Sequence, residues 1–110
     1  MLDVEEIGSL AALVNNSLVG ASKLLHFVAP NSYAIWDSKV CSFVHEKRPH
    51  NYRVNSVTAY QEYLVLLGNL AKRSEFPHFH TSVVKKVGYQ VTAMRALELV
   101  MFLNAPVYGG

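Results

Sequence analysis

Charged residues are scarce in this chain of 110 residues, and long hydrophobic runs are absent. Asp, Glu, Lys and Arg make up 16% of the sequence, whereas about a quarter is usual in a soluble domain. Hydrophobic residues make up 51%, which excludes an intrinsically disordered chain, because disorder requires low hydrophobicity and high net charge. The low charge also predicts that a protein partner, most commonly a second copy in a homodimer, covers part of the apolar surface.

Cysteine is nearly absent, since Cys41 is the only one and an internal disulfide is therefore excluded. A membrane helix needs about 18 apolar residues in a row, and Arg95 and Glu98 interrupt the best candidate. The first residues, including Asp3 and Glu5, are acidic, whereas a secretory signal begins with basic residues. We therefore expect a cytoplasmic protein in a reducing compartment, with no membrane partner.

The net charge of +2 is unevenly distributed along the chain. Residues 3–6 hold three of the eight acidic residues, which leaves five acidic residues against ten Lys and Arg in the rest of the sequence. This excess predicts a mildly basic surface, compatible with a polyanion such as DNA or RNA.

The spacing of apolar residues predicts an all-α protein. We expect one helical domain over residues 1–110, folded as a compact bundle of about five to six short helices. The expected helices cover residues 3–16, 17–28, 38–47, 55–73, 81–87 and 92–104. A strand is the alternative at residues 81–87, and residues 33–36 are expected to be extended. The sequence has no sustained alternation of apolar and polar residues, so it does not predict a sheet.

Capping and turn residues mark the expected ends of these helices. Asp37 and Thr92 can accept amide hydrogen bonds at helix starts, and Pro30 ends a helix because the residue before proline avoids the helical region. We expect loops at residues 48–51 and at residues 75–77, which include Pro77.

The sequence gives little support for a metal-binding site or a reactive cysteine. His78 and His80 flank Phe79, but a metal site needs a third ligand fixed in space. No His-Glu-x-x-His motif or cysteine cluster is present. Cys41 lies one turn into the helix capped by Asp37, where a helix N-terminus can lower a thiol pKa, but its apolar neighbours favour a buried, inert thiol. We predict neither a metal nor a cofactor.

Cations and aromatic residues alternate between residues 39 and 53, most densely at 48–53. Lys and Arg side chains can hold phosphates, and an aromatic ring can stack on a base. The candidate nucleic-acid-binding residues are Lys39, Lys47, Arg48, Tyr52 and Arg53. The alternative is that the aromatic residues belong to the core and the cations to an ordinary surface.

Residues 20–40 form the most organised stretch of the sequence. Lys23 is expected on a helix and Asp37 at the start of the next, with a short turn between them, so the two can approach. A desolvated lysine can act as an amine nucleophile, and a carboxylate can activate a water molecule. The alternative is a Lys–Asp salt bridge together with a helix cap.

The same stretch resembles the centre of the helix-hairpin-helix DNA glycosylases. The similarity rests on a Gly-x-Ser-Lys element, Gly20 to Lys23, followed by an apolar helix, and on an apolar residue, Asp37, two further residues and Val40. In that superfamily a Gly-x-x-Lys element provides the lysine that attacks the sugar, and an aspartate lies downstream. The resemblance implies these catalytic roles for Lys23 and Asp37.

The resemblance covers residues 17–47 and has three local departures, the first of which is a shorter gap from Lys23 to Asp37 than is usual in the family. The family's Leu-Pro-Gly-Val-Gly hairpin is absent, and Lys39 stands at the position of the family's histidine. These enzymes clamp a flipped base between two helical subdomains.

Three functions follow from these observations. The first is a small intracellular binding module that contacts nucleic acid through a mildly basic surface. The second is a protein–protein interaction or regulatory module, or a homodimer, with an exposed apolar patch. The third is a DNA glycosylase-like enzyme that uses Lys23 and Asp37.

Overall fold

The computed structural model describes residues 2–48 and 50–106, and this part of the chain contains helices and no strands. The helices are α1 (Val4–Leu13), α2 (Leu18–Val28), α3 (Ser38–His45), α4 (Asn51–Val54), α5 (Val57–Ala71), α6 (Phe76–Val87) and α7 (Ala93–Leu103). The predicted all-α class is confirmed. In the described residues no helix is long and apolar enough to span a membrane.

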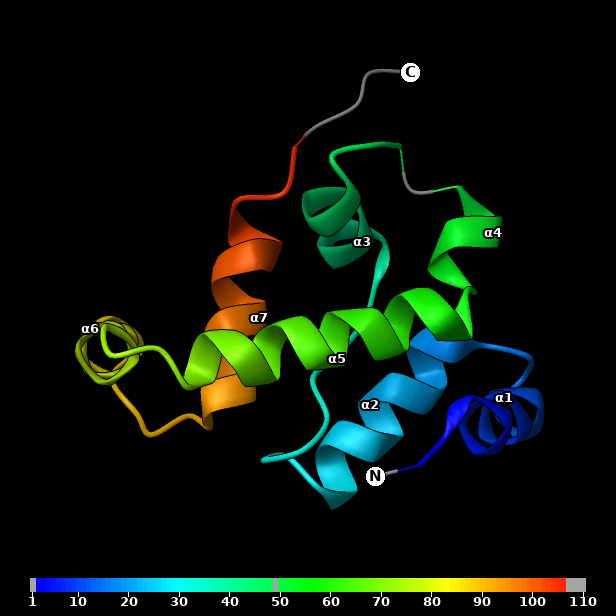
Figure 1. Cartoon of the computed structure of the whole chain (residues 1–110), viewed down its shortest axis with the longest axis horizontal. Helices are drawn as coiled ribbons and strands as arrows, with labels where there is room; N and C mark the ends of the chain where they lie inside the picture. The colour runs from blue at the N-terminus through cyan, green and yellow to red at the C-terminus, as the bar shows by residue number, and fades with distance from the viewer. Residues whose placement is uncertain (1, 49, 107–110) are drawn as a thin grey trace.

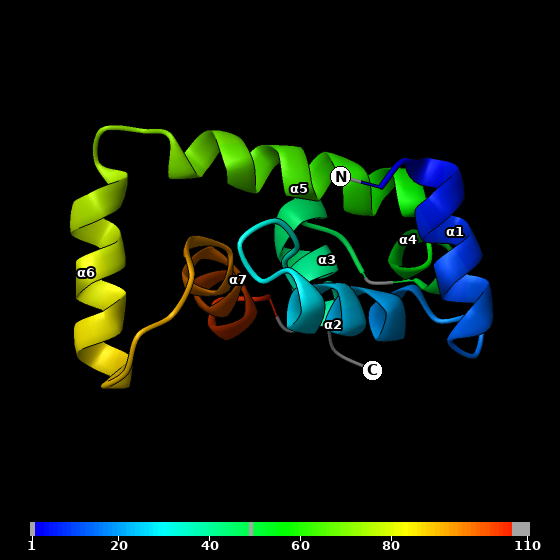
Figure 2. The ribbon, with the colours of Figure 1, turned by 90° about the horizontal axis from the view of Figure 1, so that it is seen from below.

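Helix α5 runs along the length of the molecule, and the other helices are arranged along it and at its ends (Figure 1). Helices α1 and α4 lie near its N-terminal end, whereas α6 stands beyond its C-terminal end. Figure 2 shows α2, α3 and α7 lying together along one side of α5, between these two ends. The basic stretch around α4 and the helix α6 therefore occupy opposite ends of the molecule.

Side-chain hydrogen bonds explain why α1, α2, α3, α5 and α7 begin where the sequence predicts. Each cap accepts an amide of the first turn, which would otherwise lack a partner. Asp3 and Glu6 form a reciprocal capping box at α1. The other side-chain caps are Ser17 at α2, Asp37 at α3, Ser56 at α5 and Thr92 at α7.

Helix α6 differs from the prediction, because it begins at Phe76 rather than near Thr81. The break expected at residues 75–77 instead contains the N-cap, Glu75, and the first two residues of this helix. Pro77 fits there because the first turn contains no amide that needs an intrahelical acceptor. As a result, His78 and His80 lie on a helix rather than in a loop, and the alternative of a strand at 81–87 is excluded.

Helix α4 is a single turn that the sequence did not predict. The loop expected at residues 48–51 ends one residue early, because Asn51 opens α4; Pro49, also in that loop, lies outside the described residues. With this turn, the described part of the chain has seven helices, one more than the predicted five to six.

The core is built around a non-helical segment, residues 33–37, which we call the core segment. Its Trp36 side chain is completely buried and packs against Tyr60 and Tyr63 of α5, with ring centroids 6.1 and 5.1 Å away. The indole nitrogen of Trp36 donates a hydrogen bond to the Val54 carbonyl, at 2.7 Å. Trp36 thereby ties α4 to the centre of the molecule.

Side chains from neighbouring helices satisfy the backbone of the core segment. Tyr60 donates to the Ala34 carbonyl at 2.8 Å, and Tyr63 donates to the Ile35 carbonyl at 3.3 Å. The hydroxyl of Ser22 on α2 accepts from the Trp36 amide at 2.9 Å and lies 3.1 Å from the Trp36 carbonyl. These bonds allow non-helical backbone to be buried, because unpartnered amides and carbonyls in a core are costly.

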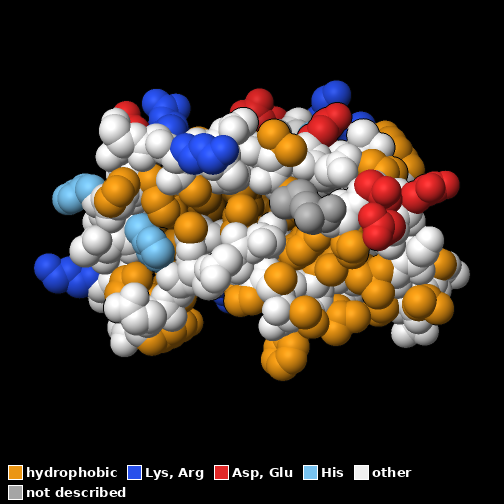
Figure 3. Space-filling view, turned by 60° about the horizontal axis from the view of Figure 1, so that its bottom comes forward, with side chains coloured by type: hydrophobic (Ala, Val, Ile, Leu, Met, Phe, Trp, Pro, Cys, Tyr) orange, Lys and Arg blue, Asp and Glu red, His pale blue; other side chains and the backbone are white. Residues whose placement is uncertain are grey.

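One face of the molecule carries exposed apolar side chains. They gather over α1 and α2 (Figure 3). On α2, Leu24, Phe27 and Val28 are 44%, 85% and 72% exposed, and Leu13 at the end of α1 is also exposed. Helix α2 therefore buries one face and leaves an apolar strip in water.

Candidate nucleic-acid interface

A pocket of about 330 Å³ lies where the end of α3, the helix α4 and the first turn of α5 meet. We call it the basic pocket. Its lining residues are His45, Lys47, Tyr52, Arg53, Ser56 and Ala59. Three of these, Lys47, Tyr52 and Arg53, belong to the predicted nucleic-acid-binding set, so the structure brings them together at one site.

Positive charge dominates the lining of the basic pocket. Lys47 and Arg53 contribute two cations, and no acidic side chain is among the lining residues. Ser56 caps the 15-residue helix α5, and the N-terminus of a helix carries a partial positive charge that favours anions. The pocket is therefore suited to a phosphate or another anion.

The imidazole of His45 connects the pocket to the core. Its Nδ1 lies 3.5 Å from the Cys41 Sγ, and its ring meets the Trp36 ring edge-on at 6.1 Å. Because Nδ1 is occupied by this contact, Nε2 is the ring nitrogen left for a ligand. The sequence analysis did not select His45, because its place beside Lys47 and Arg53 depends on the packing of α3 against α4.

Cys41 lies behind His45, where it is fully buried. Burial raises the pKa of its thiol, while the positive charge of Arg53 acts in the opposite direction. The predicted buried thiol is confirmed.

An exposed aromatic pair forms the rim of the basic pocket. Tyr52 is 68% exposed and stacks on His50, with ring centroids 5.6 Å apart and planes 8° from parallel. The Arg53 guanidinium lies 5.0 Å from the centre of the Tyr52 ring and donates a 2.7 Å hydrogen bond to the Arg48 carbonyl. The exposed Tyr52 ring therefore lies beside the cations, and an exposed aromatic ring is the kind of surface on which a base can stack.

Lys39 lies apart from the other predicted contacts. It is at the opposite end of α3 from the basic pocket, and its ammonium group lies 4.8 Å from the centre of the Phe102 ring on α7. Arg48 is exposed and does not line the pocket, but its carbonyl accepts a hydrogen bond from Arg53, which does. The predicted basic surface is therefore more compact than the sequence suggested.

Lys23 and Asp37 occupy neighbouring elements but form no ion pair with each other among the described side chains. Lys23 is exposed on α2, whereas Asp37 is half-buried and accepts the Val40 amide at 2.8 Å as the cap of α3. Their chain neighbours Ser22 and Trp36 are hydrogen-bonded to each other. The predicted cap is confirmed, and the predicted catalytic role of the two residues stays a prediction.

Glu98 on α7 is a buried carboxylate that the sequence analysis treated only as an interruption of an apolar run. It is 2% exposed and pairs with Arg95 one turn earlier. Burial raises the pKa of Glu98 and the charge of Asp37 adds to this effect, whereas Arg95 and His26 oppose it. The Arg–Glu spacing of three residues was the available sequence signal.

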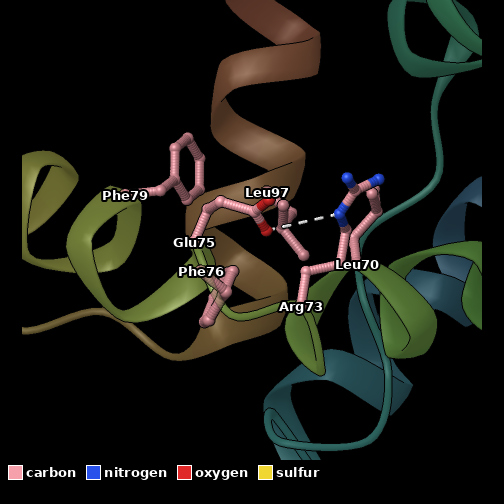
Figure 4. Close-up of a pocket in the computed structure, with 6 residues that line it drawn as sticks. All are labelled: Leu70, Arg73, Glu75, Phe76, Phe79 and Leu97. Carbon is pink, nitrogen blue, oxygen red and sulfur yellow. Dashed lines mark ion pairs between the residues drawn. The ribbon is translucent and has the colours of Figure 1, made fainter.

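A second pocket, of about 400 Å³, lies between α5, α6 and α7 (Figure 4). Its apolar lining consists of Leu70, Phe76, Phe79 and Leu97. Arg73 and Glu75 also line it and form an ion pair with each other, at 3.5 Å. Because its one lining cation is already paired with an acid, this pocket is less suited to phosphate than the basic pocket.

The histidines considered as metal ligands do not assemble into a metal site. The Nε2 atom of His80 is hydrogen-bonded to the Val91 carbonyl at 2.6 Å, and His78 is exposed. No group of three His, Cys, Asp or Glu side chains within residues 2–48 and 50–106 is placed to hold a metal ion.

Comparison with known proteins gives no relative from which to transfer a function. No protein-family model matches the sequence, no curated protein matches it, and no solved structure matches the fold.

Proposed function

We propose that the protein is a nucleic-acid-binding module that holds the phosphates of DNA or RNA in the basic pocket. The observation that carries this proposal is the convergence of Lys47, Arg53 and His45 at the first turn of α5, with no acid in the lining. Two cations brought together in one pocket favour a polyanion more strongly than the chain's small net charge does.

The side chains of the pocket and its rim have complementary tasks. Arg53 presents a planar fork of donors that suits phosphate oxygens, and Lys47 adds a mobile point charge. Tyr52, stacked on His50, offers an exposed ring on which a base can lie. The pocket thus provides affinity for phosphate, and the rim provides affinity for an unpaired base.

Fluorescence anisotropy with labelled single-stranded DNA, single-stranded RNA and duplex DNA tests the proposal. We expect affinity to fall as salt rises, because each phosphate contact releases bound counterions. Arg53→Ala should weaken binding by about tenfold and reduce the salt slope by about one. Lys85→Ala is the matched control, because Lys85 is exposed on α6 at the other end of the molecule. Absence of binding at low salt contradicts the proposal.

A homodimer through α2 is the second candidate, favoured by the apolar strip of Leu24, Phe27 and Val28. Exposed apolar patches of this kind commonly mark protein interfaces. Sedimentation velocity should then show a dimer that Phe27→Asp converts to a monomer. Tyr89→Asp serves as control, since Tyr89 is exposed outside α2. A monomer at every protein concentration contradicts this candidate.

A further inference from the structure

We infer that the basic pocket receives the phosphorylated end of a single strand: a phosphate monoester enters the pocket, and the adjoining base stacks on Tyr52. This inference rests on the proposed function and specifies its ligand. It follows from the size of the pocket, from the number of donors inside it and from the position of the aromatic rim.

The size of the pocket favours a chain end. Its volume of about 330 Å³ is near the lower limit for small-molecule sites, which run from about 300 to 1,000 Å³. Residues from the end of α3, from α4 and from the start of α5 line it. The end of a strand can enter such a hollow directly, whereas the phosphates in the middle of a duplex lie on a convex surface and would meet only its rim.

The donors in the pocket match a monoester better than a diester. Lys47, Arg53 and His45 line one space, and each of these side chains carries nitrogen atoms that can donate to a phosphate. A terminal phosphate has three acceptor oxygens and a charge of about −1.5 to −2 at neutral pH, whereas a phosphate within the chain has two free oxygens and a single charge. A terminal phosphate can therefore engage all three side chains together.

The rim explains why the strand should be single. Tyr52 is 68% exposed, and His50 and Arg53 contact its ring. An unpaired terminal base can turn onto this ring while its phosphate enters the pocket, whereas a paired terminal base exposes only its outer face and stays fixed to the opposite strand. The phosphate and the base of one terminal nucleotide would thus be held by adjacent groups of the same site.

The test compares strands that differ only at their ends. Single strands of about 12 nucleotides, a length within the usual range of single-strand sites, carry a dye on an internal base and a 5′-phosphate, a 3′-phosphate or neither. We expect one or both phosphorylated strands to bind at least about tenfold tighter than the unphosphorylated strand. Lys47→Ala should abolish this preference, and Lys85→Ala should retain it. A blunt duplex with the preferred phosphate should bind more weakly than the single strand.

The outcomes separate the inference from the proposed function. Equal, salt-dependent binding of all three strands contradicts the terminal-phosphate site and leaves the nucleic-acid-binding function standing. Binding of the phosphorylated duplex as tightly as the single strand contradicts the role of the unpaired base. No binding of any strand contradicts both.

Discussion

The core segment and the basic pocket are both built from short, irregular pieces of chain, yet they use their polar groups in opposite ways. In the core segment, Ser22, Tyr60 and Tyr63 satisfy the backbone carbonyls and amides, and no buried side-chain nitrogen or oxygen in the described residues lacks a partner. In the basic pocket, Lys47, Arg53 and His45 line a hollow. The first arrangement stabilises the fold, and the second leaves binding capacity for a ligand.

Replacing Trp36 should give the largest effect on stability. Trp36→Ala removes a fully buried side chain, and losses of this kind destabilise a protein by about 3–5 kcal/mol. Urea unfolding followed by circular dichroism measures the change. Tyr89→Ala is the control, because removal of an exposed aromatic side chain should cost less than about 0.5 kcal/mol. Similar costs for the two variants would refute the view of residues 33–37 as the structural centre.

Removing the Ser22 hydroxyl should give the next largest effect. Ser22→Ala leaves the buried amide of Trp36 without its acceptor, which should lower the free energy of unfolding by about 1–3 kcal/mol. Ser9→Ala, at an exposed position of α1, should have little effect. Affinity for single-stranded DNA should be unchanged at a temperature where both variants are folded. A Ser22→Ala protein as stable as the parent contradicts the structural role of this bond.

Two tyrosines provide a paired test of binding against stability. Tyr52→Ala should lower affinity for single strands by about tenfold, in the range measured for base stacking, and should hardly change the unfolding free energy. Tyr60→Phe removes the hydrogen bond to the Ala34 carbonyl and should lower stability by about 1 kcal/mol without changing affinity. If either variant shows the behaviour assigned to the other, the contrast between the two regions is wrong.

The smallest expected effect is the pH dependence that arises from Glu98. Burial raises its pKa above the ordinary value of 4.5, so the folded state binds the proton more tightly than the unfolded state. The resulting stabilisation is complete below pH 4.5 and is lost as pH rises through the folded pKa.

Glu98→Gln cannot ionise and should lack this loss. The unfolding free energy of the parent protein should therefore fall, relative to that of the variant, as pH increases above 4.5. Urea unfolding at a series of pH values measures the difference. Glu62→Gln, at an exposed position of α5, should follow the pH profile of the parent. Parallel profiles for the parent and Glu98→Gln would show that Glu98 is not held in a desolvated site.

The parts of the molecule that sequence could predict are local ones. Asp3, Asp37 and Thr92 cap helices through bonds to residues three positions away, so their role is readable from neighbouring residues. Lys47 and Arg53 are close in sequence, and a single turn of helix suffices to bring them together. Pro77 is a local signal that has two meanings, because proline is common both in a break and in the first turn of a helix. The prediction of a break there was therefore wrong.

The parts that sequence could not predict depend on packing between distant segments. His45 joins the basic pocket only because α3 ends against α4. Glu98 is buried because α7 packs against both α3 and α5, although its charge would ordinarily place it at the surface. Sequence therefore indicated the candidate cations and Tyr52 and missed residues whose position depends on the tertiary fold.

NMR chemical-shift mapping during titration with single-stranded DNA tests the central claim most directly. The account predicts that the largest amide shifts fall between His45 and Ala59, around the end of α3, α4 and the first turn of α5. Amides of α6 should remain unchanged. Shifts centred on Lys23 or on the apolar strip of α2, or no shifts at saturating DNA, would contradict the assignment of the basic pocket as the nucleic-acid interface.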